Sequence, residues 1–346
     1  MFVAILFILM ILMVSLSFLE EERPLTRNLI YASMVLVLVL MAGLRPLGID
    51  KDSLQYYGYY IGNFDELVEP TFIWISELVR FTIDDVQGVF IIYALLAIPL
   101  KCYVFTKLSD EHFLLLAVYT SNLLILHDMT QIRVGAAMAF VMLGFYCLVK
   151  GNRWHFLGLV LIATCFHVSA IATLVMVFFR NNELKVWHRI VLAFVPFLAF
   201  ATILFNIDFI TLIPFDFVQD KLAIYEELKD TGQIDVEKIN IFNAAIMVKM
   251  LVFYFLLWKY EVVRPHCPYL TLLLKIFALS YVCLGVFNFM AVLATRISEL
   301  FAFVEIMMVP LIIHAVVPKQ AARTLIMLYA IGIFMLNVIY SDLLAF

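Results

Sequence analysis

Long apolar runs separated by short polar connections make up most of this sequence. The runs are about 16 to 22 residues long, which suits helices that cross a hydrocarbon layer about 30 Å thick. We therefore expect an all-α polytopic membrane protein with 11–12 apolar segments, of which about ten are full transmembrane spans. The expected segments are Phe2–Leu19, Asn28–Leu44, Gly88–Phe105, His112–Leu126, Gln131–Val149, Trp154–Phe179, Ile190–Phe205, Ile241–Trp258, Tyr269–Phe289, Ile297–Val317 and Thr324–Tyr340.

The segment Trp154–Phe179 is the exception to this pattern, and the charges of the loops show why. Lysine and arginine are enriched in the short connections on the cytoplasmic side of a membrane protein. A single crossing would place the basic connections Arg180 to Arg189 and Lys259 to Arg264 outside. A segment that enters and leaves on the same side removes this conflict, so we predict a helical hairpin around His167 that turns near Phe166–Ser169. One tilted span is the alternative.

Two longer polar stretches, about residues 45–87 and 206–240, then face outward, and neither is long enough for an independent soluble domain. We expect residues 1–346 to form a single integral membrane domain. In the first stretch, the sequence EPTFIWISELVRFTI has apolar residues at helical spacing, which predicts a helix lying on the membrane surface.

Composition supports a membrane protein and excludes several other classes. Hydrophobic residues make up 65% of the chain and charged residues only 14%, compared with roughly 25% charged residues in soluble domains. The net charge of −4 argues against a nucleic-acid partner. The sequence contains no nucleotide-binding, zinc-protease or hydrolase motif.

Three arginines occur near the predicted outer ends of spans: Arg45, Arg133 and Arg296. A guanidinium group offers a planar set of donors that matches a diphosphate. We therefore predict that Arg133, Arg296 and Arg45 bind a diphosphate. Arg45 and Arg296 have an alternative role as interfacial anchors that reach lipid headgroups.

His167 and Asp50 are the candidate catalytic bases, with Arg133 assisting. An ionisable group inside a membrane segment is a functional candidate because its burial is unfavourable, and imidazole accepts a proton near neutral pH. A hydrogen-bonded core histidine is the alternative for His167, and a solvated loop charge is the alternative for Asp50.

Several further residues are candidates for glycan binding: Tyr56, Tyr57, Tyr60, Gln131 and Glu299. Tyrosine rings pack against sugar faces, although an interfacial aromatic belt explains the tyrosines equally well. Glu299 follows Arg296 by three residues, so the two could also pair on one helix face.

Several motifs together resemble the EpsG family of Wzy-type polysaccharide polymerases. They are GLRPLGIDKDSLQYY, EPTFIWISELV, QIRVGAAMAF, the HVSAI element at His167 and TRISELFAF, and they extend from about Arg45 to Pro310. Family members often carry Gly-Thr-Asp before the tyrosines, where this chain has Gly48-Ile49-Asp50.

The resemblance implies a multi-pass protein of the bacterial inner membrane with its active site facing the periplasm. It implies polymerisation of O-antigen, capsule or exopolysaccharide units, in which the growing glycan moves from undecaprenyl diphosphate onto a new lipid-linked unit. The implied partners are the lipid-linked oligosaccharide donor and acceptor, membrane lipids and a chain-length regulator protein. We expect no cofactor and no metal, because the lipid diphosphate is already an activated leaving group.

Other functions for the same residues are a flippase of lipid-linked sugars, a glycan ligase and a lipid-linked-sugar glycosyltransferase. A flippase is expected to place its charges along a path through the bilayer, whereas here they gather at one predicted face.

Overall fold

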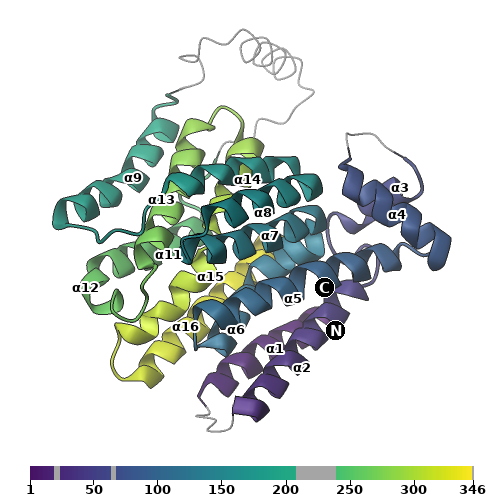
Figure 1. Cartoon of the computed structure of the whole chain (residues 1–346), viewed down its shortest axis with the longest axis horizontal. Helices are drawn as coiled ribbons and strands as arrows, with labels where there is room; N and C mark the ends of the chain where they lie inside the picture. The colour runs from purple at the N-terminus through teal and green to yellow at the C-terminus, as the bar shows by residue number, and fades with distance from the viewer. Residues whose placement is uncertain (19–23, 64–67, 208–238, 345–346) are drawn as a thin grey trace. The chain divides into compact units, whose positions relative to one another are not determined.

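The computed structural model describes residues 1–18, 24–63, 68–207 and 239–344. Of the described residues, 79% are helical and none belongs to a β-strand, which confirms the all-α prediction (Figure 1). Most of the second predicted outer stretch, 206–240, lies outside the described residues.

Six helical segments of the described chain are long and apolar enough to cross a membrane, so the prediction of a multi-pass membrane protein is supported. They are α2 (Pro24–Gly43), α5 (Gln87–Leu108), α7 (Ile132–Val149), α9 (Val186–Leu204), the run Ala291–His314 and the run Lys319–Tyr340. The run Ala291–His314 contains α14 (Ala291–Ala302), α15 (Glu305–Met308) and η4 (Val309–His314), and the run Lys319–Tyr340 contains α16 (Lys319–Met335) and η5 (Leu336–Tyr340). A seventh is possible if α6 (His112–Ser121) and η1 (Leu124–Thr130), which meet at a 64° bend, form one span.

The predicted number of about ten full spans is not confirmed, because three expected spans form shorter helices. These are α1 (Phe2–Ser17), α11 (Ala244–Trp258) and α13 (Leu270–Val286). The start of α11 shows a local cause: the Asn243 side chain accepts a hydrogen bond from the Ala245 backbone at 2.8 Å. This cap begins the helix later than the apolar run does.

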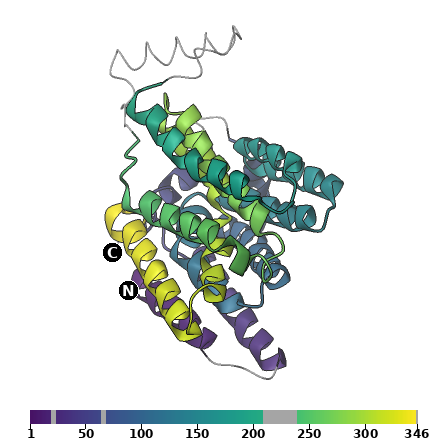
Figure 2. The ribbon, with the colours of Figure 1, turned by 90° about the vertical axis from the view of Figure 1, so that its left-hand side faces the viewer.

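The predicted break at His167 is confirmed. Helix α8 (Arg153–Phe166) ends there, His167 is extended (φ −155°, ψ 118°), and η2 (Val168–Phe178) follows directly. The two helices run side by side in both views (Figures 1 and 2). At about 1.5 Å per residue in the α-helix and about 2.0 Å in the 3-10 helix, each is too short to cross a bilayer alone.

The chain divides into two compact units, one formed by Met1–Phe178 with Ile306–Phe346 and the other by Phe179–Glu305. In the first unit, α7 packs between α5 and α8, while α2 packs against α5 and α1 against α6. Close packing at the start of α7 depends on Gly135, where an added Cβ would lie 2.6 Å from the His127 carbonyl oxygen. The expectation of a single membrane domain stays a prediction.

The first predicted outer stretch forms two helices, α3 (Ser53–Tyr60) and α4 (Pro70–Thr82), so the helix predicted in EPTFIWISELVRFTI is confirmed. Helix α4 is amphipathic: it buries Phe72 and Val79 and exposes Trp74 and Phe81. The buried side chains join one apolar cluster with tyrosines of α3 and with residues of α5 and α7. This cluster fixes α3 and α4 over the ends of those two helices.

The second unit contains α9, α11, α12 (Tyr260–Val263), α13 and α14, with α13 packed against both α9 and α14. The Tyr260 hydroxyl accepts a hydrogen bond from the Leu184 backbone at 3.0 Å and lies 2.7 Å from the Thr271 hydroxyl. These bonds tie the segment before α9 to the start of α13.

Candidate active site

Arg133 and His167, the two residues that the sequence analysis places at the centre of the chemistry, meet at one carboxylate. The Arg133 guanidinium forms an ion pair with Oε2 of Glu69. The imidazole Nδ1 of His167 lies 2.8 Å from Oε1 of the same side chain. We call these three residues the Glu69 cluster.

Each member of the Glu69 cluster stands at the end of a helix, for a local reason. Glu69 directly precedes Pro70, which is favoured in the first turn of a helix because it lacks an N–H. Arg133 is the second residue of α7, and His167 occupies the extended break between α8 and η2. The fold thus brings Arg133 and His167, which follow Glu69 by 64 and 98 residues in the sequence, to the Glu69 carboxylate.

Two aromatic rings of α3 hold the Arg133 side chain in place. The guanidinium carbon lies 5.8 Å from the ring centre of Tyr56 and 5.6 Å from that of Tyr59. Both rings are buried. A cation near the face of an aromatic ring is attracted by the electrons of that face, so the tyrosines and Glu69 together fix the guanidinium.

The cluster is only partly covered, and its carboxyl group is ionised at neutral pH. The side chains of Arg133 and His167 are 16% and 19% exposed, whereas Glu69 is 8% exposed. Burial raises the pKa of Glu69, but the hydrogen bond with His167 and the charge of Arg133 outweigh it and hold the pKa below its usual 4.5. A ligand from outside therefore meets the guanidinium and the imidazole before the carboxylate.

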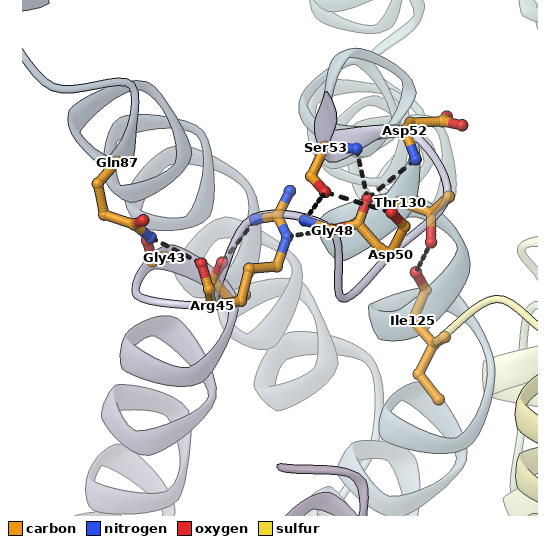
Figure 3. Close-up of polar contacts among 10 residues, drawn as sticks. Gly43, Arg45, Gly48, Asp50, Asp52, Ser53, Gln87, Ile125 and Thr130 are labelled. Atoms are coloured by element: carbon orange, nitrogen blue, oxygen red, sulfur yellow. Dashed lines mark hydrogen bonds and ion pairs between the residues drawn. The ribbon is translucent and has the colours of Figure 1, made fainter. Parts of the chain in front are cut away.

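Arg45 and Asp50 form a separate, sealed ion pair (Figure 3). The Arg45 Nε lies 2.7 Å from Asp50 Oδ2, and both side chains are fully buried. Arg45 also donates to the Ala42 carbonyl at 2.6 Å, and its guanidinium lies 4.1 Å from the centre of the Phe90 ring. Asp50 Oδ1 accepts a hydrogen bond from the Ser53 backbone at 2.8 Å, at the start of α3.

This geometry favours structural roles for both residues. The predicted diphosphate-binding role of Arg45 and the predicted basic role of Asp50 each require a group that a substrate can reach. Here the Asp50 carboxylate is fully buried and already accepts hydrogen bonds from Arg45 and from the start of α3. The pair holds the turn between α2 and α3.

The predicted glycan-binding residues differ in their accessibility. Tyr56 and Tyr60 are buried, which favours packing over glycan contact. Tyr57 is 42% exposed and is the accessible tyrosine of the predicted three. Gln131 is half-buried, two residues before Arg133 at the bend between η1 and α7.

Arg296 and Glu299 belong to the second unit, in α14. Arg296 is exposed and Glu299 is half-buried. Among the described residues no salt bridge joins the two, so the predicted alternative of a direct pair is not seen. The second unit does contain an ion pair that the sequence analysis missed, between Lys249 Nζ and Glu305 Oε2 at 2.7 Å.

Glu69 and a buried polar group in the first unit were not predicted from the sequence. Lys101 Nζ lies 2.6 and 2.7 Å from the carboxylate oxygens of Asp128. The Tyr119 hydroxyl donates to the same carboxylate at 2.5 Å. The ion pair could have been predicted from Lys101, because a lysine within an apolar span is unfavourable without a partner. Glu69 could have been predicted as the first residue of the motif EPTFIWISELV.

The Glu69 cluster combines a fixed cation with an imidazole that has one free nitrogen. Among the described residues His167 Nε2 has no hydrogen-bond partner, because only Nδ1 is engaged by the carboxylate. A carboxylate on Nδ1 holds the tautomer in which Nε2 can accept a proton. The described parts of the chain contain no group of three His, Cys, Asp or Glu residues that could hold a metal ion.

Comparisons with known proteins give one match. No curated protein and no solved structure matches the chain. A model of the EpsG family matches residues 28–345. This range contains all three residues of the Glu69 cluster. Because the match spans nearly the whole chain, the protein belongs to the EpsG family of Wzy-like polysaccharide polymerases.

Proposed function

We propose that this protein polymerises oligosaccharide repeat units carried on undecaprenyl diphosphate, at the outer face of the bacterial inner membrane. The growing glycan leaves its lipid diphosphate and is joined to a new lipid-linked unit. The observation that carries the proposal is the meeting of Arg133 and His167 at Glu69, in a chain of a polysaccharide polymerase family.

In this proposal Arg133 binds the donor diphosphate. The bond between the anomeric carbon and the diphosphate oxygen breaks, so negative charge develops on the leaving group. A fixed guanidinium stabilises that charge without reorganising during the reaction. Its fixation by the rings of Tyr56 and Tyr59 supports this role. Arg296 belongs to the second unit, and its predicted diphosphate-binding role stays a prediction.

His167 acts as the general base on the acceptor. The acceptor hydroxyl oxygen forms the new bond to the anomeric carbon, and its proton passes to His167 Nε2. The partly exposed imidazole and its engaged Nδ1 support this assignment. The buried, fully engaged Asp50 is a poorer candidate for the same step. Tyr57 is placed by its exposure to contact sugar.

The test is the glycan ladder of a deletion strain that carries Arg133→Ala or His167→Ala. We expect single repeat units in place of long chains, because one change removes the group that stabilises the leaving diphosphate and the other removes the proposed base. Arg80→Ala is the matched control: Arg80 is exposed on α4, outside the Glu69 cluster, and should give a normal ladder. Long chains from either test variant, at normal membrane abundance, would contradict the proposal.

The same ladder separates the other functions. Loss of a ligase leaves no unit on the acceptor, and loss of a flippase leaves units stranded on the cytoplasmic side. Orientation is tested by an impermeant thiol reagent in a cysteine-free background, since the native chain has the exposed Cys165. A cysteine replacing Leu54 on α3 should be labelled from outside, and one replacing Asn182 should not.

A further inference from the structure

The Glu69 carboxylate binds two groups that the proposed reaction uses separately. Oε2 engages Arg133, which the proposal assigns to the diphosphate, and Oε1 engages His167, which it assigns to the acceptor hydroxyl. Glu69 lies deeper than either partner, since it is less exposed than both. It therefore reaches both groups from the protein side and leaves their outer sides open.

Resting on the proposed function, we propose that Glu69 is a positioning residue with two opposed effects: it competes with the lipid diphosphate for Arg133 and orients His167 for proton transfer. On binding, the diphosphate takes over the guanidinium contact made by Oε2, while Oε1 stays on the imidazole. Glu69 itself neither gains nor loses a covalent bond.

The competition follows from charge. In the resting cluster the carboxylate neutralises Arg133, so the arginine presents no net charge to a ligand. A diphosphate that reaches the guanidinium must replace this contact or lie beside a second negative group, and either option weakens binding. A guanidinium has five donors, and the ion pair with Glu69 uses Nη1, so room remains for the diphosphate to approach first.

The orienting effect follows from the imidazole contact. With a carboxylate on Nδ1, the tautomer that leaves Nε2 free is favoured, and the positive charge that develops on the ring is stabilised. An amide at position 69 keeps the size of the side chain but removes the charge that supports both effects. Binding and turnover should therefore change in opposite directions.

The experiment compares Glu69→Gln with the wild type, both as full-length protein in detergent. Binding is measured with undecaprenyl diphosphate, and turnover is measured as the rate of chain growth on lipid-linked repeat units. We expect binding to be about tenfold tighter, because the competing charge interaction that is removed is about as large as one that shifts a pKa by one unit. We expect turnover lower by up to about 10⁴-fold, the loss caused by the corresponding Asp→Asn change beside the histidine of a catalytic triad.

Two further variants make the result specific. Glu69→Asp keeps the charge and should bind close to the wild type while recovering part of the turnover. Glu77→Gln changes an exposed acid on the same helix, α4, and should alter neither measurement. If Glu69→Gln is poorly folded, Glu69→Asp still tests the proposal, because full loss of turnover in a monodisperse Glu69→Asp protein would overturn it.

The outcomes separate the inference from the proposed function. If Glu69→Gln lowers binding and turnover together, Glu69 is only a structural support and the inference is overturned. Tighter binding with unchanged turnover would overturn the orienting half. If Arg133→Ala binds undecaprenyl diphosphate as well as the wild type does, the proposed function itself fails, whatever Glu69→Gln shows.

Discussion

Two ion-pair regions of the first unit differ in how completely their charges are satisfied. The Lys101–Asp128 pair is sealed, with neither side chain exposed, and its carboxylate oxygens lie 2.6 and 2.7 Å from the same ammonium. In the Glu69 cluster, Arg133 and His167 are partly exposed, and each keeps capacity to bind another group.

This difference in exposure distinguishes ion pairs that stabilise the fold from charged residues that can bind a substrate. The third member of the sealed group, the Tyr119 hydroxyl, also donates to Asp128. This group joins α5, α6 and η1 at the 64° bend, and η1 leads directly to the start of α7 and Arg133. Buried charges that are fully paired hold an element in place, whereas a partly exposed cluster can exchange one partner for a substrate.

The largest effect is expected on breaking the sealed pair. Lys101→Ala leaves an unpaired carboxylate in the interior and should lower stability by about 3–5 kcal/mol. Thermal unfolding of the detergent-purified protein measures this loss. The double variant Lys101→Met/Asp128→Asn removes both charges but keeps an oxygen for Tyr119, so it should recover most of the stability. Lys107→Ala, at the exposed end of α5, is the control. A fully stable Lys101→Ala protein would contradict the assignment of this pair as scaffold.

A medium effect is expected at Gly135, where η1 and α7 approach each other. The added methyl group of Gly135→Ala would lie 2.6 Å from the His127 carbonyl oxygen and 2.7 Å from Asp128 Oδ1, so one of the two elements must shift. Overpacking of this kind lowers stability by about 1–3 kcal/mol. Gly158→Ala is the matched helical control, since nothing lies within 4 Å of its added Cβ. Equal unfolding temperatures for the two variants would refute the close-packing argument.

The smallest effect concerns pH. The pKa of Glu69 is lowered in the folded protein, so its ionised form stabilises the fold above pH 4.5, and that contribution is lost as the pH falls through the lowered pKa. The stability difference between the wild type and Glu69→Gln should therefore be present at about pH 6 and shrink below 4.5. Unfolding temperatures across this range measure it. A difference that grows toward acid would show that Glu69 is not held in its ionised form.

Much of the fold could be predicted from the sequence because it depends on local patterns. Apolar runs indicate the helices, and the charges of the loops locate the break at His167. Helix ends were less predictable, since one cap such as Asn243 shortens a helix within a continuous apolar run. For α11 this is why the expected full-length span is not confirmed.

The candidate site was only half predictable. Arg133 and His167 stand out because charge is unfavourable in apolar segments. Glu69 lies in an ordinary polar connection, and only the folded chain brings it to partners 64 and 98 residues away. Arg45 and Asp50 look equally functional in the sequence, and only their complete burial indicates a structural role.

The most direct test of the central claim, that glycosyl transfer takes place at the Glu69 cluster, is the rate of chain growth by purified His167→Ala protein on undecaprenyl-diphosphate-linked repeat units. The account predicts a fall of about 10²- to 10⁴-fold, the usual contribution of a general base, in a protein that still unfolds cooperatively and retains diphosphate binding through Arg133. Chain growth within about twofold of the wild type, well below the smallest effect expected of a general base, would contradict the claim.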